Sequence, residues 1–427
     1  MANGELNYFR ENHGYKRILE GIYKKYRSLG RLGGTVTLRR LTDEERNVLG
    51  NHLKRDYSRK KSASFSVKAF EESLKDTRFE QYSLEDILEG YFGIDLISKA
   101  EEEARYLEGR SKDFEILLSK YRDEPAGKWL KDVLDGTVTG IRRVKTAHFR
   151  DRKGLIQSME WVSEALNILG SKREGGTFRL PVLASLITRD PHAFDGGTLA
   201  GNLLIDALCT IYSFPPPSNN QDVAEILYSG GILIDEISNF ITIAGLRAVK
   251  GGKPHPVWDF AMAEGEMLQV PLANLVDIER ITSPIDRVYV VENPAVFSAL
   301  LDGCKGQEIP PLVCSYGQIK LAGLIVLDKL AREGVNIFYS GDFDPEGLLI
   351  ANKLAHRYGD SFHLWRYGTE EYRGVVSEQK ISLKRLSMLD LIDYPGLQGA
   401  KEEMKVLGRA GYQELLINSL LEDIDHR

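Results

Sequence analysis

The feature that most constrains the fold is a regular alternation of strand-like and helix-like segments in the last third of the sequence. Strands are expected at 287–292, 311–314, 335–341 and 362–366. Helices are expected between them at 294–303, 316–333 and 345–357. Strands that alternate with helices predict a parallel sheet, because each connection must run back along the sheet before the next strand begins. We therefore expect an α/β domain here.

Acidic residues stand where two of these strands end. The strand at 287–292 ends in Glu292, and the strand at 335–341 runs into Gly-Asp-Phe-Asp-Pro-Glu, which contains Asp342 and Asp344. Right-handed crossovers place the carboxyl ends of parallel strands on one edge, where open α/β sheets build their sites. Residues i and i+2 of an extended chain also point to the same side. We expect the three acids to share one site.

Three clustered carboxylates repel each other, which raises their pKa values unless a cation offsets the charge. A set of oxygen ligands without His or Cys suits Mg²⁺ or Mn²⁺, and such sites favour phosphoryl transfer. We assign catalytic and metal-binding roles to Glu292, Asp342 and Asp344, with Glu346 as a further candidate ligand. A position in the first turn of a helix explains Glu346 equally well.

An alternative interpretation treats Asp344 only as a helix cap. The sequence Asp344-Pro-Glu346 has Asp in the N-cap position, Pro at the first helical position and Glu in the first turn,. The cap explains Asp344, but it accounts neither for Asp342 nor for the separate strand that ends in Glu292. We therefore favour the metal site.

Composition is that of an ordinary globular protein. The 427 residues are 42% hydrophobic and 28% charged, and this length predicts two to four domains,. No apolar run is long enough to span a bilayer, and the chain does not begin with a signal segment, so we expect no membrane association,. Three cysteines form no spaced cluster,. We expect a cytoplasmic protein.

Charge is distributed unevenly along the chain. Residues 1–80 hold 18 Lys or Arg against 11 Asp or Glu, although the whole chain has a net charge of −6. A second basic stretch lies at 142–153. Such patches can contact DNA phosphates, although a solvated surface is the simpler interpretation of any one charge run. The candidate DNA-binding residues are Arg59, Lys60, Lys61, Arg142, Arg143 and Lys145.

The remaining sequence predicts smaller modules. Thr42-Asp-Glu-Glu45 has the form of a capping box at a helix start,. Two short β runs, Gly231–Ile234 and Phe240–Ala244, are expected to form the hairpin of a winged helix. His192 and Asp195 lie in a turn, where we interpret them as turn residues rather than as a base and its partner.

We expect five parts in all. They are a basic, winged-helix-like α/β module at 1–80, a helical acidic arm at 81–154, a helical and winged-helix-like DNA-binding domain at 155–283, the α/β domain at 284–370 and a helical extension at 371–427.

The residues at the strand ends resemble a known family. Glu292 and Asp342-Phe-Asp344 have the order and spacing of the Toprim domain of topoisomerases, primases and related nucleases. The closer similarity is to the bacterial family that serves as the JetD nuclease subunit of Wadjet anti-plasmid systems. The similar segments are Val291–Pro294, Cys314–Gln318, Tyr339–Gly347, Leu180–Ala184, Asp190–Gly197, Gly230–Asp235 and Tyr412–Leu416.

The resemblance implies a Mg²⁺-dependent DNA endonuclease related to the A subunit of type IIB, topoisomerase VI-like enzymes. It implies that residues 284–370 are a Toprim domain with a Rossmann-like parallel sheet and that residues 155–283 are CAP-like. It also implies a homodimer and a partnership with an SMC-like ATPase complex that delivers plasmid double-stranded DNA. In that mechanism Glu292 is a metal ligand or general base, while Asp342 and Asp344 hold the cation or cations.

Three residues near these acids are further candidates. Ser315 and Gln318 could contact a metal ligand or a phosphate, and Lys320 could meet a phosphate. Ordinary roles explain them as well, since Ser and Gln often structure loops and a lysine on an amphipathic helix usually faces solvent.

Two other functions remain open. Type IIB topoisomerase A subunits use a tyrosine in an Arg-led motif with adjacent tyrosines, whereas Tyr212 stands alone here. Hydrolytic cleavage therefore fits better than covalent strand passage, although a topoisomerase or recombination subunit is one alternative. The other is a DNA-binding scaffold whose Toprim site is structural, but such a scaffold need not keep costly clustered acids.

Overall fold

The computed structural model describes residues 3–75, 77–171 and 176–425. The chain divides into two compact units. The first contains the residues up to 122 together with 133–135, and the second contains 123–132 and 136–427. The five expected parts remain an interpretation of the sequence within this division. No helix in the described ranges has the length and apolar character needed to cross a bilayer.

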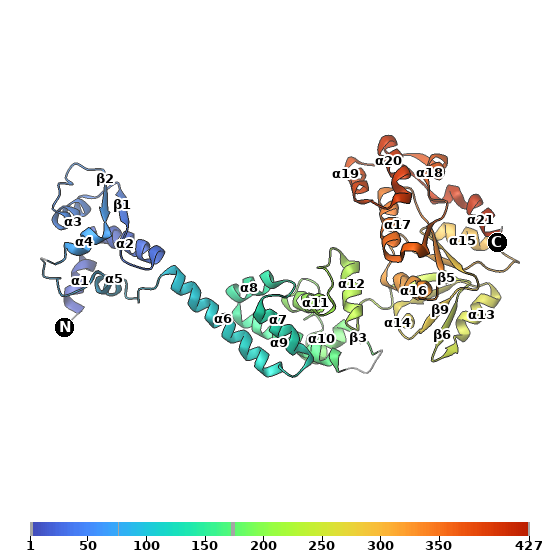
Figure 1. Cartoon of the computed structure of the whole chain (residues 1–427), viewed down its shortest axis with the longest axis horizontal. Helices are drawn as coiled ribbons and strands as arrows, with labels where there is room; N and C mark the ends of the chain where they lie inside the picture. The colour runs from blue at the N-terminus through green and yellow to red at the C-terminus, as the bar shows by residue number, and fades with distance from the viewer. Residues whose placement is uncertain (1–2, 76, 172–175, 426–427) are drawn as a thin grey trace. The chain divides into compact units, whose positions relative to one another are not determined.

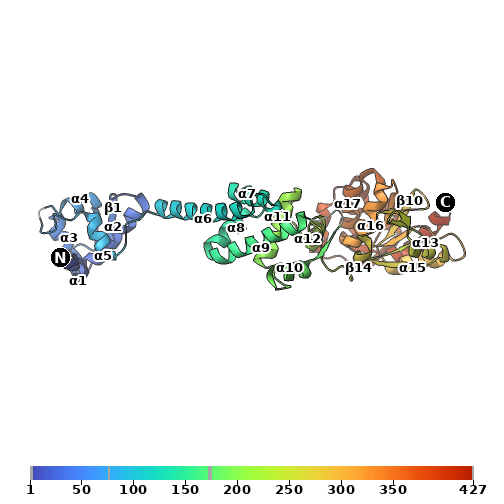
Figure 2. The same cartoon turned by 90° about the horizontal axis from the view of Figure 1, so that it is seen from below.

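The first unit contains helices packed around a two-stranded antiparallel sheet (Figure 1). Its elements are α1 (Asn3–Glu11), α2 (Lys16–Leu29), β1 (Thr35–Arg39), α3 (Asp43–Leu53), β2 (Ser62–Ser66), α4 (Val67–Glu72), α5 (Leu84–Phe92) and α6 (Lys99–Tyr121). Strands β1 and β2 are antiparallel, and alternate residues of each are buried. This alternation is typical of a sheet with one face on the core. Figure 2 shows α6 as one unbroken helix.

Local capping signals of the first unit are confirmed. The Thr42 side chain accepts a hydrogen bond from the Glu45 N–H, and the Glu45 carboxylate accepts one from the Thr42 N–H. Ser83 and Ser98 begin α5 and α6 in the same way. These reciprocal bonds satisfy backbone donors that a helix start leaves free.

The second unit begins with helices that precede its main sheet. They are α7 (Pro125–Asp135, whose last three residues belong to the first unit), α8 (Ile141–Arg150), α9 (Arg152–Gly170), α10 (Leu180–Thr188), α11 (Leu199–Tyr212) and α12 (Asn220–Ser229). The prediction that Gly231–Ile234 and Phe240–Ala244 pair as a hairpin is wrong. Strand β4 (Ile232–Leu233) pairs with β3 (Phe178–Arg179), whereas Phe240–Ala244 joins the main sheet. Both runs are apolar, and strand pairing is decided by partners distant in sequence.

The main sheet has six strands and is mixed. In spatial order they are β13 (Phe362–Leu364), β12 (Asn336–Ser340), β10 (Arg287–Val291), β11 (Leu312–Cys314), β5 (Phe240–Ala244) and β8 (Leu268–Pro271). The first four are parallel, as the alternating pattern predicts, and β5 and β8 extend the sheet in antiparallel pairing. The chain is therefore a mixed α/β protein.

Helices and small strands complete the second unit. The helices are α13 (Pro256–Glu264), α14 (Leu272–Leu275), α15 (Pro294–Gly303), α16 (Leu321–Arg332), α17 (Pro345–Tyr358), α18 (Thr369–Val375), α19 (Leu383–Leu386), α20 (Gln398–Leu407) and α21 (Ile417–Asp425). Strands β6 (Arg247–Lys250), β7 (Lys253–Pro254) and β9 (Arg280–Thr282) form a small sheet, and β14 (Val376–Lys380) pairs with β15 (Arg409–Gly411).

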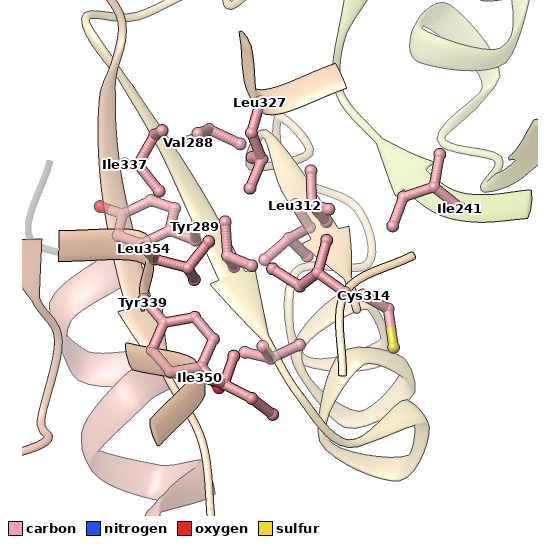
Figure 3. Packing of buried hydrophobic residues seen from close by; sticks show 14 of the residues in the cluster. Ile241, Val288, Tyr289, Leu312, Cys314, Leu327, Ile337, Tyr339, Ile350 and Leu354 are labelled. Carbon is pink, nitrogen blue, oxygen red and sulfur yellow. The ribbon is translucent and has the colours of Figure 1, made fainter. Parts of the chain in front are cut away.

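The central strands are buried on both faces. Val288, Leu312 and Ile337 of three neighbouring strands belong to one core with Leu327 of α16 and Leu354 of α17 (Figure 3). Such continuous apolar runs are typical of parallel strands covered by helices. The packing fixes the positions of the strand ends, where polar residues follow.

The parallel part of the sheet has a topological switch point. The chain goes from β10 to β11 on one side and then returns to β12 on the other side of β10. In open α/β sheets, ligands bind outside the carboxyl ends of the strands at such a point. Glu292 follows β10 and Asp342 follows β12, so both acids lie at the switch point.

Candidate functional site

The parallel pairing of β10 with β12 brings the first two acids together. Val291 lies opposite Ser340, so Glu292 continues one strand beside Gly341 of the other. A Cβ atom on Gly341 would lie 2.7 Å from Glu292 Oε2 and 2.7 Å from the Tyr339 hydroxyl oxygen. Glycine at 341 therefore leaves the room that the Glu292 carboxylate occupies.

Glu292 is half-buried, and among the described residues its hydrogen-bond partners include no basic side chain. Its Oε2 atom accepts hydrogen bonds from the Tyr339 hydroxyl and from the Asp342 backbone N–H, each at 3.3 Å. Burial raises the pKa of Glu292 to about 7, and the negative charges of Asp342 and Asp344 add to the shift. The site therefore disfavours the ionised carboxylate although two donors face it.

A C-terminal segment, 409–416, holds Asp342 in place; we call it the strap. Phe343 and Gly411 exchange two backbone hydrogen bonds of 3.0 and 2.9 Å. The Gln413 backbone N–H donates to Asp342 Oδ1 at 2.8 Å. Burial, together with the charges of Glu414 and Asp344, raises the pKa of Asp342, and the Gln413 hydrogen bond partly offsets this.

The strap also reaches the loop that carries Glu292. The Asn293 backbone N–H donates to Gln413 Oε1 at 3.1 Å, and Asn293 Nδ2 donates to Glu414 Oε1 at 2.7 Å. Gln413 is fully buried, and its Nε2 atom has no partner among the described residues, as is true of the buried Ser340 hydroxyl. One segment thus positions both acid-bearing loops.

Asp344 caps α17, as the alternative interpretation predicts, but the cap uses only one of its two carboxylate oxygens. Its Oδ1 atom accepts a hydrogen bond of 2.8 Å from the Gly347 N–H at the start of α17. Its Oδ2 atom lies 2.5 Å from a guanidinium nitrogen of Arg385, which also pairs with Glu346. Burial raises the pKa of Asp344, whereas the Arg385 hydrogen bond lowers that of Glu346.

The expected convergence of three carboxylates is therefore not seen. Within the part of the chain that the structure describes, no group of three or more His, Cys, Asp or Glu residues is arranged to hold a metal ion. Glu292 and Asp342 lie together, but the cap and Arg385 engage both oxygens of Asp344. Asp344 keeps an extended backbone and still raises the pKa values of Glu292 and Asp342, but its side chain binds the start of α17 and Arg385 instead of joining the other two acids.

The three neighbouring candidates make ordinary structural contacts. The buried Ser315 hydroxyl donates to the Val291 carbonyl at 3.4 Å. Gln318 Nε2 donates to Gln221 Oε1 at 3.0 Å, and Lys320 Nζ donates to the Ser238 carbonyl at 3.4 Å. None of these bonds reaches the acids.

The candidate DNA-binding residues fall into two groups. Arg59, Lys60 and Lys61 are exposed between α3 and β2, and Arg142 and Lys145 are exposed on α8. Arg143 differs, because its Nε atom donates to the buried Asp206 carboxylate at 2.9 Å. Its charge is therefore already balanced within the protein.

His192 Nδ1 donates a 2.8 Å hydrogen bond to Asp195 Oδ2; the His192 side chain is exposed and Asp195 is half-buried. The Asp195 carboxylate raises the pKa of His192. This local i,i+3 pair agrees with the interpretation of both as turn residues.

Sequence reasoning missed four residues of the site. Tyr339 and Tyr367 are buried tyrosines whose hydroxyls bond to Glu292 and to the Asp342 carbonyl, and Gln413 and Arg385 hold the aspartates. The segment Tyr412–Leu416 was singled out by resemblance, but without a role. Arg385 carries no local signal, since an arginine on a short polar helix is usually solvated.

Two family models match the chain. Residues 32–248 match "Protein of unknown function N-terminus (DUF3323)", and residues 268–424 match "Protein of unknown function C-terminus (DUF2399)". The second match contains the acids and the strap. No curated protein matches the chain. Since the first match covers a little more than half of the sequence, the chain belongs to the DUF3323 family.

Proposed function

We propose that this protein is the DNA endonuclease subunit of a bacterial SMC-like anti-plasmid complex of the Wadjet type. It cleaves phosphodiester bonds by hydrolysis and depends on Mg²⁺ or Mn²⁺. Under this proposal the α/β region is a Toprim domain, the subunit works as a homodimer in the cytoplasm, and an SMC-like ATPase complex brings it double-stranded plasmid DNA.

One observation carries the enzymatic part of the proposal. Glu292 and Asp342 meet at the switch point of the sheet with their charges opposed by neutral donors alone: the Tyr339 hydroxyl and the backbone N–H groups of Asp342 and Gln413. Burying like charges together is costly, and a cation relieves the cost. If these acids had only a structural role, we would expect a positively charged side chain next to them.

The donor set fits a hard divalent cation. Glu292 and Asp342 offer carboxylate oxygens without sulfur or imidazole, as Mg²⁺ and Mn²⁺ prefer. Asp344 completes the set once its bond to Arg385 opens. When bound, such a cation polarises a phosphate and stabilises the leaving oxygen. Where the cation is held by the aspartates and not by Glu292, burial raises the Glu292 pKa and suits this carboxylate to accept a proton from the attacking water,.

The two family matches support the partner assignment. An N-terminal DUF3323 match followed by a C-terminal DUF2399 match is the domain pair known for JetD/Wadjet-like proteins. DNA contacts are assigned to Arg59, Lys60 and Lys61 and to the exposed α8 residues Arg142 and Lys145. Arg143 is excluded, because Asp206 already holds it.

The test is cleavage of supercoiled plasmid in Mg²⁺ or Mn²⁺, with and without the SMC-like complex. Wild type is compared with Glu292→Ala and Asp342→Ala, and each variant is checked for folding by thermal denaturation. We expect the wild type to cut with its partners present and both variants to lose cutting. Equal cutting by the three proteins would refute the proposed site.

A second candidate function is that of a DNA-binding scaffold. It is favoured by Arg385, which balances the charges of Asp344 and Glu346 within the chain. A scaffold would bind plasmid DNA with the same affinity in both acid variants and would cut it under none of the conditions above.

A further inference from the structure

Arg385 forms a fork across two acids of the candidate site. It lies on the short helix α19, about forty residues after Asp344 in the sequence. Its Nε atom lies 2.9 and 3.1 Å from the two carboxylate oxygens of Glu346. One terminal nitrogen lies 2.5 Å from Glu346 Oε2 and 2.5 Å from Asp344 Oδ2.

These bonds leave no carboxylate oxygen of either acid without a donor. Asp344 uses Oδ1 for the Gly347 N–H and Oδ2 for Arg385. Glu346 uses both oxygens for Arg385. A guanidinium stays charged at every pH at which the protein is folded. Arg385 therefore provides a fixed positive charge on the Asp344 side of the site.

The other side of the site differs. Within the described ranges, the hydrogen bonds to the carboxylates of Glu292 and Asp342 come from a hydroxyl and backbone N–H groups, all of them neutral. A divalent cation can approach Glu292 and Asp342. If it also binds Asp344, the positive charge of Arg385 repels it. Arg385 and a divalent cation thus compete for Asp344 Oδ2.

We propose that Arg385 is a built-in counter-cation that a divalent cation must displace from Asp344, with Glu346 as the anchor that keeps the guanidinium nearby. This rests on the proposed function only for the presence of a cation at Glu292 and Asp342. Arg385 then weakens cation binding, so the site fills only at higher concentrations of free cation. Glu346 is accordingly an arginine partner and no metal ligand.

The experiment is a titration of the full-length protein with Mn²⁺, in which electron paramagnetic resonance measures the free ion. We expect Arg385→Ala to bind Mn²⁺ about fivefold or more tightly than wild type, which is the lower end of typical coupling between two ligands. Glu346→Gln loosens the hold on Arg385, so it should also bind more tightly. Weaker binding by either variant, or an unchanged affinity of Arg385→Ala, would overturn the proposal.

Arg373→Ala is the matched control. Arg373 also bridges two carboxylates, those of Glu370 and Glu403, in the same C-terminal region, and these ion pairs involve none of the three acids. Its removal should leave the Mn²⁺ affinity unchanged. A change equal to that of Arg385→Ala would mean that net charge alone accounts for the effect, which also contradicts the proposal.

Asp342→Asn separates this proposal from the proposed function. If wild type and Asp342→Asn bind Mn²⁺ equally or not at all, the metal site itself is wrong. If binding is lost in Asp342→Asn but Arg385→Ala matches wild type, the metal site stands and the role of Arg385 is wrong. Thermal unfolding supplies a second measurement, because tighter binding to the native state gives a larger rise in unfolding temperature with Mn²⁺.

Discussion

Among the buried groups with a displaced pKa, His52 of the first unit and Glu292 of the second differ in their partners. His52 in the first unit has a pKa lowered to about 4 by burial, while Glu292 in the second has one raised to about 7. The His52 ring bonds to the Tyr15 and Ser73 hydroxyls, each at 2.8 Å, and the neutral ring is fully satisfied. Glu292 instead faces two further acids.

The comparison of His52 with Glu292 shows that a displaced pKa by itself indicates burial and does not identify a functional site. The His52 network is neutral and closed, so it stabilises a core and needs no ligand. Glu292 and Asp342 leave negative charge that their neutral donors do not balance. Unbalanced charge, rather than the size of the shift, distinguishes a candidate site from a structural network.

The largest expected difference is in catalysis. Glu292→Gln should lower plasmid cleavage by the assembled complex by about 100- to 1000-fold, as the loss of one key group in an active site commonly does. His52→Gln should leave the rate unchanged at a temperature at which the variant is folded. Equal losses in the two variants would remove the distinction between the two networks.

The free energy of unfolding, unlike the cleavage rate, should depend on His52. His52→Ala leaves the Tyr15 and Ser73 hydroxyls with one partner fewer and opens a cavity, so we expect the first unit to lose about 3 kcal/mol of unfolding free energy at pH 7. Calorimetry measures this as a lower unfolding temperature of that unit. A loss below about 1 kcal/mol would mean that the network is not structural.

The two groups should give opposite pH dependences. Folded His52 binds fewer protons than the unfolded chain between about pH 6.5 and 4, so it costs stability as the pH falls through that window,. Folded Glu292 binds more protons between about pH 4.5 and 7, so it costs stability as the pH rises,.

In a chelating buffer at pH 8, Glu292→Gln should therefore be more stable than wild type by about 1–2 kcal/mol, after allowance for partial solvent screening. The gain should vanish near pH 4. Denaturant unfolding at the two pH values measures it, and a gain that is the same at both would show that repulsion is not its cause.

The smallest expected difference concerns two helix caps. Thr42→Ala should cost the first unit about 1 kcal/mol, the usual value for a lost cap. Asp344→Ala removes a cap and one Arg385 contact, but Glu346 still pairs with Arg385 and one of the repelling acids is gone, so its cost should be closer to zero. If Asp344→Ala cost as much as Thr42→Ala in a chelating buffer, the repulsion among the acids would be negligible.

Much of the α/β fold could be predicted because its signals are local. The helix at 294–303 is confirmed residue for residue, and the four parallel strands lie within one or two residues of their expected ends. The Thr42 capping box involves residues three apart. By contrast, β5 and β8 join the sheet by pairing with distant segments, which no local pattern indicates.

In the candidate site, too, the features with local signals could be predicted and the contacts between distant residues could not. The sequence by itself determined that Glu292 and Asp342 follow strands whose carboxyl ends share an edge, because alternation and crossover geometry require it. Only the tertiary structure decided that Arg385 holds Asp344, that the strap fixes Asp342 and that it also binds the loop after Glu292. These contacts join residues about 40 to 120 positions apart, and they form only when packing brings separate elements together.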